Sequence, residues 1–103
     1  MPSHLTMLGG VMEIEKLIFA LEETIVFLRR SQSSVWANLS TDEIIQELKS
    51  EITKAKNSQP NDVQLLASLF APTGAIQETS IDNSWGDDFL RISGIVDHFT
   101  TDR

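Results

Sequence analysis

The side chains that could do chemistry are concentrated between residues 71 and 89. This segment combines hydroxyl, amide, carboxylate and indole groups, and its candidate recognition residues are Thr73, Gln77, Glu78, Asn83, Trp85, Asp87 and Asp88. Carboxylates that converge on one point bind hard cations or act as general acids and bases. Hydroxyl, amide and indole groups recognise a partner through hydrogen bonds and apolar contact. The segment therefore indicates either a recognition surface or, as the alternative, a carboxylate-based site.

A calcium loop is the sharpest interpretation of these carboxylates, and its spacing fails. Asp82 would open the loop, but Gly86 then stands at the fifth position, whereas the pattern needs glycine at the sixth. The twelfth position is Ser93, whose hydroxyl cannot replace a bidentate glutamate. Carboxylates near the start of a helix are also favoured by the helix dipole without any ligand. We therefore predict no metal site.

The same segment also has a purely structural interpretation. Trp85 is the first apolar residue of the last predicted helix, and we expect it to close one end of a bundle with its indole N–H on a backbone acceptor. Thr73, Gln77, Glu78 and Asn83 would then hold the segment in place through hydrogen bonds to its backbone. The sequence alone leaves packing and recognition both open.

Catalytic patterns are absent from the sequence. The two histidines are His4, in the presumed N-terminal tail, and His98, in the last turn of the last predicted helix, where a cation complements the helix dipole. There is no Cys, which removes thiolate catalysis, disulfides and Cys-based zinc sites. Nucleophile-elbow, zinc-protease, P-loop and dinucleotide-binding motifs are also missing. We predict no catalytic residue and no cofactor; the alternative is a small hydrolase or metal-dependent enzyme that uses the carboxylates of residues 78–88.

The charge of the chain limits its partners. Its 103 residues carry 8 Lys and Arg against 15 Asp and Glu, a net charge of -7. Residues 57–103 hold 7 of the acidic and only 2 of the basic side chains. Such a field repels phosphate backbones and anionic lipids, so we expect neither nucleic acid nor membrane as a partner. A protein with a basic surface is the expected partner.

Apolar residues recur with the period of an α-helix over four segments. Residues 12–32 carry one stripe, formed by Ile14, Leu17, Ile18, Leu21, Ile25 and Leu28. The second helix is predicted to start at a capping box of Ser40 and Glu43 and to run to about residue 56. A shorter helix, capped by Asn61 or Asp62, ends before Pro72. Asn83 or Ser84 is predicted to cap the last helix, whose stripe is Trp85, Phe89, Ile92, Val96 and Phe99.

Residues 75–83 fit no regular period. Ile76 and Ile81 are the large apolar residues there and do not share a strand face, so we predict an ordered loop. The expected fold is all-α: a small four-helix bundle-like single domain over residues 12–103, with a long ordered loop before the last helix. Residues 1–11 are predicted to be a flexible N-terminal tail, and Met12 is an alternative physiological start to Met1.

No targeting or membrane signal stands out. Residues 1–11 lack the basic region of a signal peptide, and the most apolar window, residues 17–28, is interrupted by Glu22 and Glu23. The absence of Cys is compatible with a reducing cytoplasm, which is the predicted location.

The first helix is apolar over more than one stripe. Phe19, Val26 and Phe27 widen its apolar sector, which predicts a second neighbour on that side or another subunit. A structural homodimer through these three residues is therefore a further alternative.

The C-terminal part of the chain has a short helical run followed by two patterns: A-P-T-G-x-x-Q-E over residues 71–78 and N-x-W-G-x-x-F over residues 83–89. This order resembles a family of small uncharacterised bacterial proteins, a domain of unknown function. The resemblance covers roughly the C-terminal third. A glycine often lies between the Asn and the Trp in that family, where this chain has Ser84. The resemblance implies a helical bacterial domain and transfers no activity.

Taken together, these patterns favour a non-enzymatic protein-protein interaction module of the immunity or regulatory type. The acidic C-terminal half, the missing catalytic motifs and the broad apolar sector of the first helix support this hypothesis.

Overall fold

A computed structural model gives the three-dimensional structure of the chain and describes residues 13–101. The predicted N-terminal tail over residues 1–11, with His4, lies outside the described residues. The helices are α1 (Pro2–Arg29, of which residues 13–29 are described), α2 (Thr41–Lys56), α3 (Val63–Leu69), α4 (Ala75–Asp82) and α5 (Gly86–Thr101). The described residues contain no strand, so the predicted all-α fold is confirmed.

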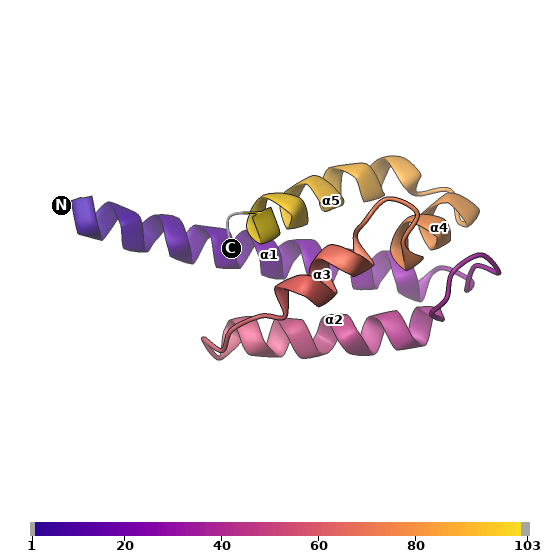
Figure 1. Ribbon diagram of the computed structural model, residues 1–103, viewed down its shortest axis with the longest axis horizontal. Coiled ribbons are helices and arrows are strands. Elements are labelled where there is room, and N and C mark those ends of the chain that lie inside the picture. Colours follow the sequence, from indigo (N-terminus) through magenta and orange to yellow (C-terminus); the bar gives the residue numbers. More distant parts are fainter. Residues whose placement is uncertain (1, 102–103) are drawn as a thin grey trace.

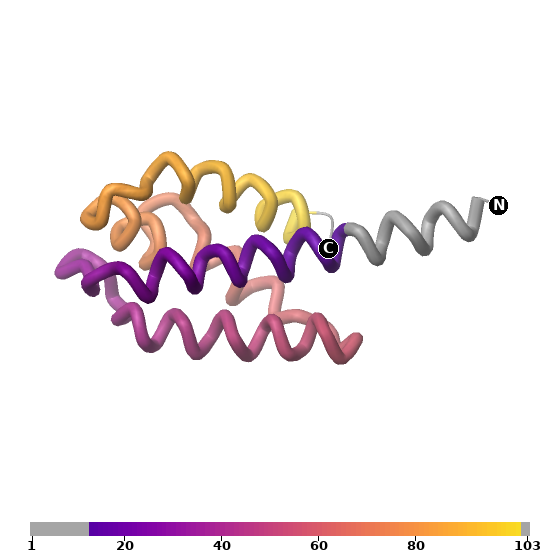
Figure 2. Tube along the Cα trace, turned by 180° about the vertical axis from the view of Figure 1, so that it is seen from behind, coloured from indigo at the N-terminus to yellow at the C-terminus, as the bar shows by residue number. Residues whose placement is uncertain are grey.

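Three long helices lie side by side with α1 in the middle. Figure 1 shows α5 on one side of α1 and α2 on the other, both antiparallel to it. The short helices α3 and α4 cover one broad face of this layer, and Figure 2 shows the opposite face, where α1 is in front. Both α3 and α4 contact α5. The end of α1, the start of α2, α4 and the start of α5 consequently meet at one end of the bundle.

The core is built by the apolar stripes of the long helices. Leu17, Leu21 and Leu28 of α1 are fully buried, as are Ile44 and Leu48 of α2. The stripe of α5 is also buried, with relative exposures of 6% or less: Trp85, Phe89, Ile92, Val96 and Phe99. Each large apolar side chain contributes about 1.5–3 kcal/mol when it is removed from water, so these stripes dominate the stability of the fold.

Local capping fixes where α2 and α3 begin. The hydroxyl of Ser40 accepts the N–H of Glu43 at 3.2 Å, and the Glu43 carboxylate accepts the N–H of Ser40 at 3.0 Å. This is the predicted capping box. Asp62 caps α3 through its carboxylate, which accepts the N–H of Leu65 at 3.0 Å. These groups satisfy amide donors that a helix start leaves without intrahelical partners.

A buried carboxylate holds the connection between α2 and α3. Glu51 is 1% exposed, and its Oε1 accepts the N–H of Asp62 at 2.8 Å and the side-chain amide of Asn61 at 3.0 Å. Lys54 Nζ donates to the other oxygen at 2.9 Å. This hydrogen bond and the charge of Glu51 raise the pKa of Lys54. Glu51 therefore acts as an anchor for the loop, because its charge is hydrogen-bonded on both oxygens.

The predicted loop over residues 75–83 is wrong, because most of it forms α4. Its buried face consists of Ala75, Ile76, Thr79 and Ser80, which follow helical spacing. Two of these four are hydroxyl residues, so the stripe does not read as apolar. The Thr79 hydroxyl donates to the carbonyl of Ala75 at 2.8 Å, and the Ser80 hydroxyl donates to the carbonyl of Gln77 at 2.7 Å. These hydrogen bonds offset the free-energy cost of burying the two hydroxyl groups. The bundle thus has a fifth helix where a loop was expected.

The start of the last helix also differs from the prediction. Asn83 is the C-terminal cap of α4 rather than the N-terminal cap of α5. Ser84 has φ 67° and lies in the left-handed region, which turns the chain between the two helices. Trp85 is buried as expected, but its indole N–H donates to the hydroxyl of Ser31 at 2.8 Å, a side-chain and not a backbone acceptor.

Candidate functional site

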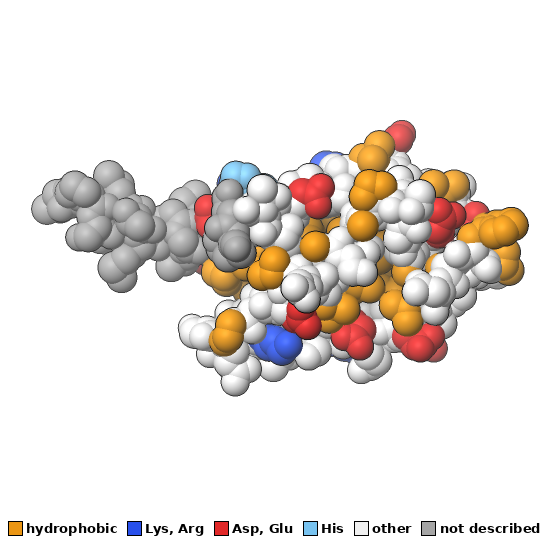
Figure 3. All heavy atoms as spheres, in the orientation of Figure 1, with side chains coloured by type: hydrophobic (Ala, Val, Ile, Leu, Met, Phe, Trp, Pro, Cys, Tyr) orange, Lys and Arg blue, Asp and Glu red, His pale blue; other side chains and the backbone are white. Residues whose placement is uncertain are grey.

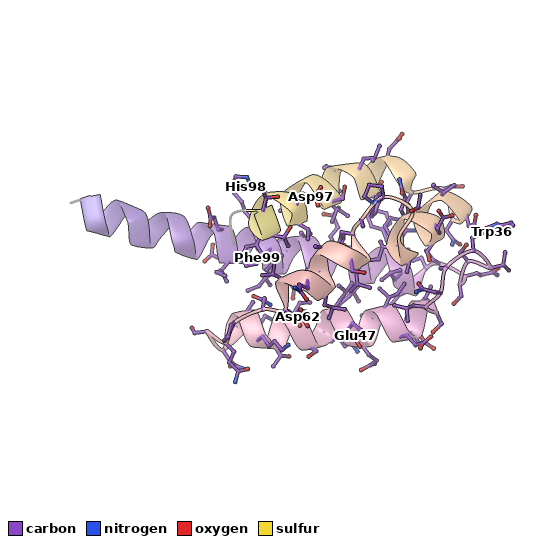
Figure 4. The ribbon with its side chains drawn as sticks, in the orientation of Figure 1. Trp36, Glu47, Asp62, Asp97, His98 and Phe99 are labelled. Atoms are coloured by element: carbon purple, nitrogen blue, oxygen red, sulfur yellow. The ribbon has the colours of Figure 1, made fainter. Side chains whose placement is uncertain are left out.

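The loop between α1 and α2 presents the most exposed large apolar side chains of the described residues. Val35 is 88% exposed and Trp36 is 77% exposed. Figure 4 shows Trp36 pointing away from the bundle at the end where α1 stops. A tryptophan costs free energy when water covers it, and indole rings are enriched at the centres of protein interfaces. The exposed pair marks this loop as the candidate recognition surface, defined here as residues 32–37 together with the end of α4.

Hydrogen bonds to the end of α4 fix this loop. The side chain of Asn83 forms two hydrogen bonds with the backbone of Gln32. Its Oδ1 accepts the Gln32 N–H at 3.0 Å, and its Nδ2 donates to the Gln32 carbonyl at 2.8 Å. The buried hydroxyl of Ser34 donates to the carboxylate of Asp82 and accepts the N–H of Trp36 at 3.1 Å. Trp36 is therefore displayed on a backbone that is already ordered.

A stacked pair of a buried and a partly buried aromatic ring lies next to the first residues of the loop. The ring of Trp85 stacks on that of Phe27, with centroids 4.8 Å apart and an angle of 11° between the planes. The Ser31 hydroxyl, which accepts from Trp85, itself donates to the Phe27 carbonyl at 2.8 Å. The first residues after α1 are consequently tied to the start of α5.

This end of the molecule carries both signs of charge, with acidic groups in excess. Asp42 in the first turn of α2, Asp82 and Asp87 are exposed there, together with the cations Arg29 and Arg30 at the end of α1. Figure 3 shows apolar side chains at the tip of this end with acidic side chains beside them. A cationic partner surface complements such an arrangement.

A shallow groove of about 290 Å³ adjoins Trp36. It lies between the loop and the turn that joins α3 to α4, and its lining includes Trp36, Leu39, Leu65, Leu69, Thr73 and Gly74. Thr73 has φ 61°, and its N–H donates to the side-chain oxygen of Gln77. Of the residues singled out from the sequence, Thr73 thus lies beside Trp36, and Gln77 holds the turn.

The other predicted site residues lie on α4 and at its junction with α5. Asn83 and Trp85 use their side chains to position the loop, as described above. Glu78 is half-buried on α4, and Asp87 is exposed in the first turn of α5. Asp88 pairs with Arg91 at 3.3 Å. The seven residues are therefore spread along one stretch of chain, and Trp36 is the side chain that the structure adds to them.

Two of the carboxylates of residues 78–88, those of Asp82 and Asp88, have different partners. Asp82 accepts from Ser34 and Asp88 pairs with Arg91, which also contacts Glu23 at 3.1 Å. Within residues 13–101, no three His, Asp or Glu side chains come together in a way that could hold a metal ion. Asp82 and Asp88 are thus engaged by side chains of the same chain.

The apolar sector of α1 divides into two parts. Phe19 is 69% exposed and Val26 is 45% exposed, so both face solvent on the side opposite the core. The partly buried ring of Phe27 stacks on Trp85, which is a second neighbour of α1, one of the two expectations for this sector. The homodimer through Phe19, Val26 and Phe27 stays a prediction.

The sequence analysis did not single out Val35 and Trp36 as candidate site residues. A usable signal existed: the pair stands in a serine-rich break, outside every helical stripe, and an apolar residue without periodic partners has no core face to join. Glu51 was missed for the opposite reason, since a charged residue on a helix is expected in solvent.

No protein-family model matches the chain, and no similar curated protein or solved structure was found. The resemblance of the C-terminal third to a small bacterial family therefore stays a prediction. Among the helices that the structure describes, none is both long and apolar enough to cross a membrane.

Proposed function

We propose that this protein is a non-enzymatic protein-interaction module, of the kind that serves in immunity or regulation, and that its partner docks on the loop carrying Val35 and Trp36. One observation carries the proposal: Trp36 is 77% exposed on a loop whose backbone is fixed to α4. An exposed aromatic side chain on a preordered backbone is suited to binding and contributes nothing to the core.

The energetics support a binding role. Tryptophan buries about 150–250 Å² in an interface, and truncating such an anchor typically costs about 2 kcal/mol or more of binding free energy. Ordering a flexible loop on binding would offset part of this gain. The hydrogen bonds of Gln32 and Ser34 to Asn83 and Asp82 reduce that cost, because the loop is ordered before the partner arrives.

The partner is expected to be basic. Asp42, Asp82 and Asp87 are exposed at this end of the bundle, where they outnumber the cations Arg29 and Arg30, and the whole chain has a net charge of -7. Attraction between these carboxylates and a cationic surface patch raises the association rate. Such attraction weakens with salt, because the Debye length falls from about 10 Å at 0.1 M to about 3 Å at 1 M.

The test is affinity capture with three immobilised versions of the protein at low and high salt. Wild type should retain a basic partner at low salt and less of it at high salt. Trp36→Ser should retain markedly less at both, whereas Phe19→Ser, which removes an exposed ring from the middle of α1, should behave as wild type. A partner retained equally by wild type and Trp36→Ser, or equally at both salt concentrations, would contradict the proposal.

A further inference from the structure

A second groove lies on the outer side of the bundle, between α1 and α2. Its volume is about 450 Å³, and its lining residues are Glu22, Ile25, Val26, Arg29, Lys49, Ile52 and Thr53. The floor is apolar, while cations lie at its rim. Its volume falls in the range of about 300–1,000 Å³ that is typical of sites for small groups. The groove is therefore large enough for one aromatic side chain.

Two cationic side chains, Arg29 and Lys49, lie at the rim of this groove. Neither Arg29 nor Lys49 forms an ion pair or a side-chain hydrogen bond with any residue that the structure describes. Glu22, the acidic residue of the groove, is paired with Lys56 at 3.6 Å. The groove is thus a local basic and apolar site in an acidic chain, and it is complementary to an aromatic group with acidic neighbours.

We propose that the occupant is Trp36 of a second copy of this chain. This inference rests on the proposed function: the partner is a second copy, and its basic surface is the groove with Arg29 and Lys49. Trp36 supplies an exposed indole, and Asp42 and Asp82 supply carboxylates around its loop. The groove supplies an apolar floor on which the indole ring can pack. Its two cations, Arg29 and Lys49, can contact the face of the ring and pair with the carboxylates of Asp42 and Asp82. Indole is the strongest cation–π acceptor among side chains, so Arg29 and Lys49 have a specific reason to favour it.

The positions of the two surfaces fit a symmetric pair. The groove lies between the last two turns of α1 and the second half of α2, whereas Trp36 lies beyond the end of α1, at the tip of the bundle. A twofold axis between these two surfaces would place the Trp36 of each copy against the groove of the other. Such an isologous contact closes on itself as a dimer and does not propagate into a filament.

The first experiment is the molar mass of the purified protein, measured by light scattering and sedimentation over a wide range of concentrations. Wild type should reach the mass of a dimer as its concentration rises. Trp36→Ser should weaken the dimer about thirtyfold or more, as expected for loss of interface anchors. The double variant Arg29→Glu/Lys49→Glu should weaken it similarly. All replaced side chains are exposed, and circular dichroism checks that each variant folds.

The decisive experiment mixes these two variants. Trp36→Ser retains both groove cations, and Arg29→Glu/Lys49→Glu retains its Trp36. A mixed pair therefore regains one of the two contacts that each variant loses with itself. We expect the mixture to form heterodimers at concentrations at which each variant alone is monomeric.

Two control variants separate this interface from others. Lys16→Glu reverses one cationic side chain on α1 outside the groove, half of the charge change in the double variant, and Phe19→Ser removes an exposed ring from the middle of α1. Both should dimerise as wild type. Dimerisation lost in Phe19→Ser but kept in Trp36→Ser, or a mixture that stays monomeric, would overturn the inference. A wild-type monomer at every concentration would also overturn it, and would leave the proposed function to be tested on a different, basic partner.

Discussion

The indole N–H of Trp85 donates to the hydroxyl of Ser31 across 2.8 Å and 54 positions of sequence. This bond joins the start of α5 to the end of α1 directly beneath the loop that displays Trp36. Trp85 also stacks on the ring of Phe27, so a hydrogen bond and a ring contact together connect α5 to the end of α1. The stability of this connection is open to direct measurement.

Trp85→Phe should keep an aromatic ring near Phe27 and lose the hydrogen bond, and we expect it to lower the free energy of unfolding by about 1–3 kcal/mol. Ser31→Ala should cost about 1 kcal/mol. Because the two groups bond to each other, the double variant should cost less than the sum, with a coupling of about 0.5–1.5 kcal/mol. Denaturant titrations of the four proteins measure it. Strict additivity would show that the bond contributes nothing in solution.

Glu51→Ala should be strongly destabilising, by about 2–4 kcal/mol, because it leaves the N–H of Asp62 and the amide of Asn61 without their acceptor. Glu51→Gln should cost less, since an amide oxygen still accepts. Glu47→Ala is the matched control on the same helix, because Glu47 is exposed; it should stay within about 0.5 kcal/mol of wild type. Equal losses in the two alanine variants would contradict the anchoring role of Glu51. Thermal and urea unfolding provide the comparison.

Two glycines should respond in opposite directions to alanine. A Cβ added at Gly94, within α5, meets nothing within 4 Å, so Gly94→Ala should stabilise the protein by about 0.5–1 kcal/mol through helix propensity. A Cβ at Gly74 would lie 2.9 Å from the carbonyl oxygens of Ala71 and Ser68. Gly74→Ala should therefore destabilise by about 1–3 kcal/mol. Melting temperatures that move in the same direction would refute the packing at Gly74.

Ser84→Gly should stabilise the turn between α4 and α5. Ser84 has φ 67°, and this left-handed conformation costs a non-glycine residue about 1–2 kcal/mol. Glycine adopts it freely but loses more entropy on folding, so the expected net gain is about 0.5–1 kcal/mol. Ser50→Gly, on the exposed face of α2, is the opposing control and should cost about 0.5 kcal/mol. Denaturant midpoints for both variants, compared with wild type, decide the point.

The capping box should make α2 sensitive to acid. The backbone N–H of Ser40, and then its hydroxyl, lower the pKa of Glu43 below its ordinary value of 4.5. The unfolded chain therefore binds the proton more readily, and the contribution of Glu43 to stability is complete above pH 4.5 and is lost as the pH falls through the lower, folded value. Glu43→Gln retains a capping side chain without titrating. As the pH is lowered through this range, the free energy of unfolding should fall less steeply for Glu43→Gln than for wild type. Parallel curves for the two proteins would contradict a stabilising role of the Glu43 carboxylate.

The sequence by itself determined the helices whose signals are local. Periodic apolar stripes predict α1, α2 and α5, and the Ser40–Glu43 spacing predicts where α2 starts, because helix faces and caps depend on residues three or four positions apart. Acidic character and the absence of catalytic motifs are likewise properties of the sequence alone.

Tertiary structure decided what depends on distant neighbours. Thr79 and Ser80 are buried in α4 because each hydroxyl finds a carbonyl acceptor in its own helix and α5 covers the face, which no apolar count reveals. Glu51 is buried because Asn61 and Asp62 fold back onto it. A side chain is buried only where another part of the chain covers it. Trp85 stacks on Phe27, whereas no described residue covers Trp36, which therefore stays exposed.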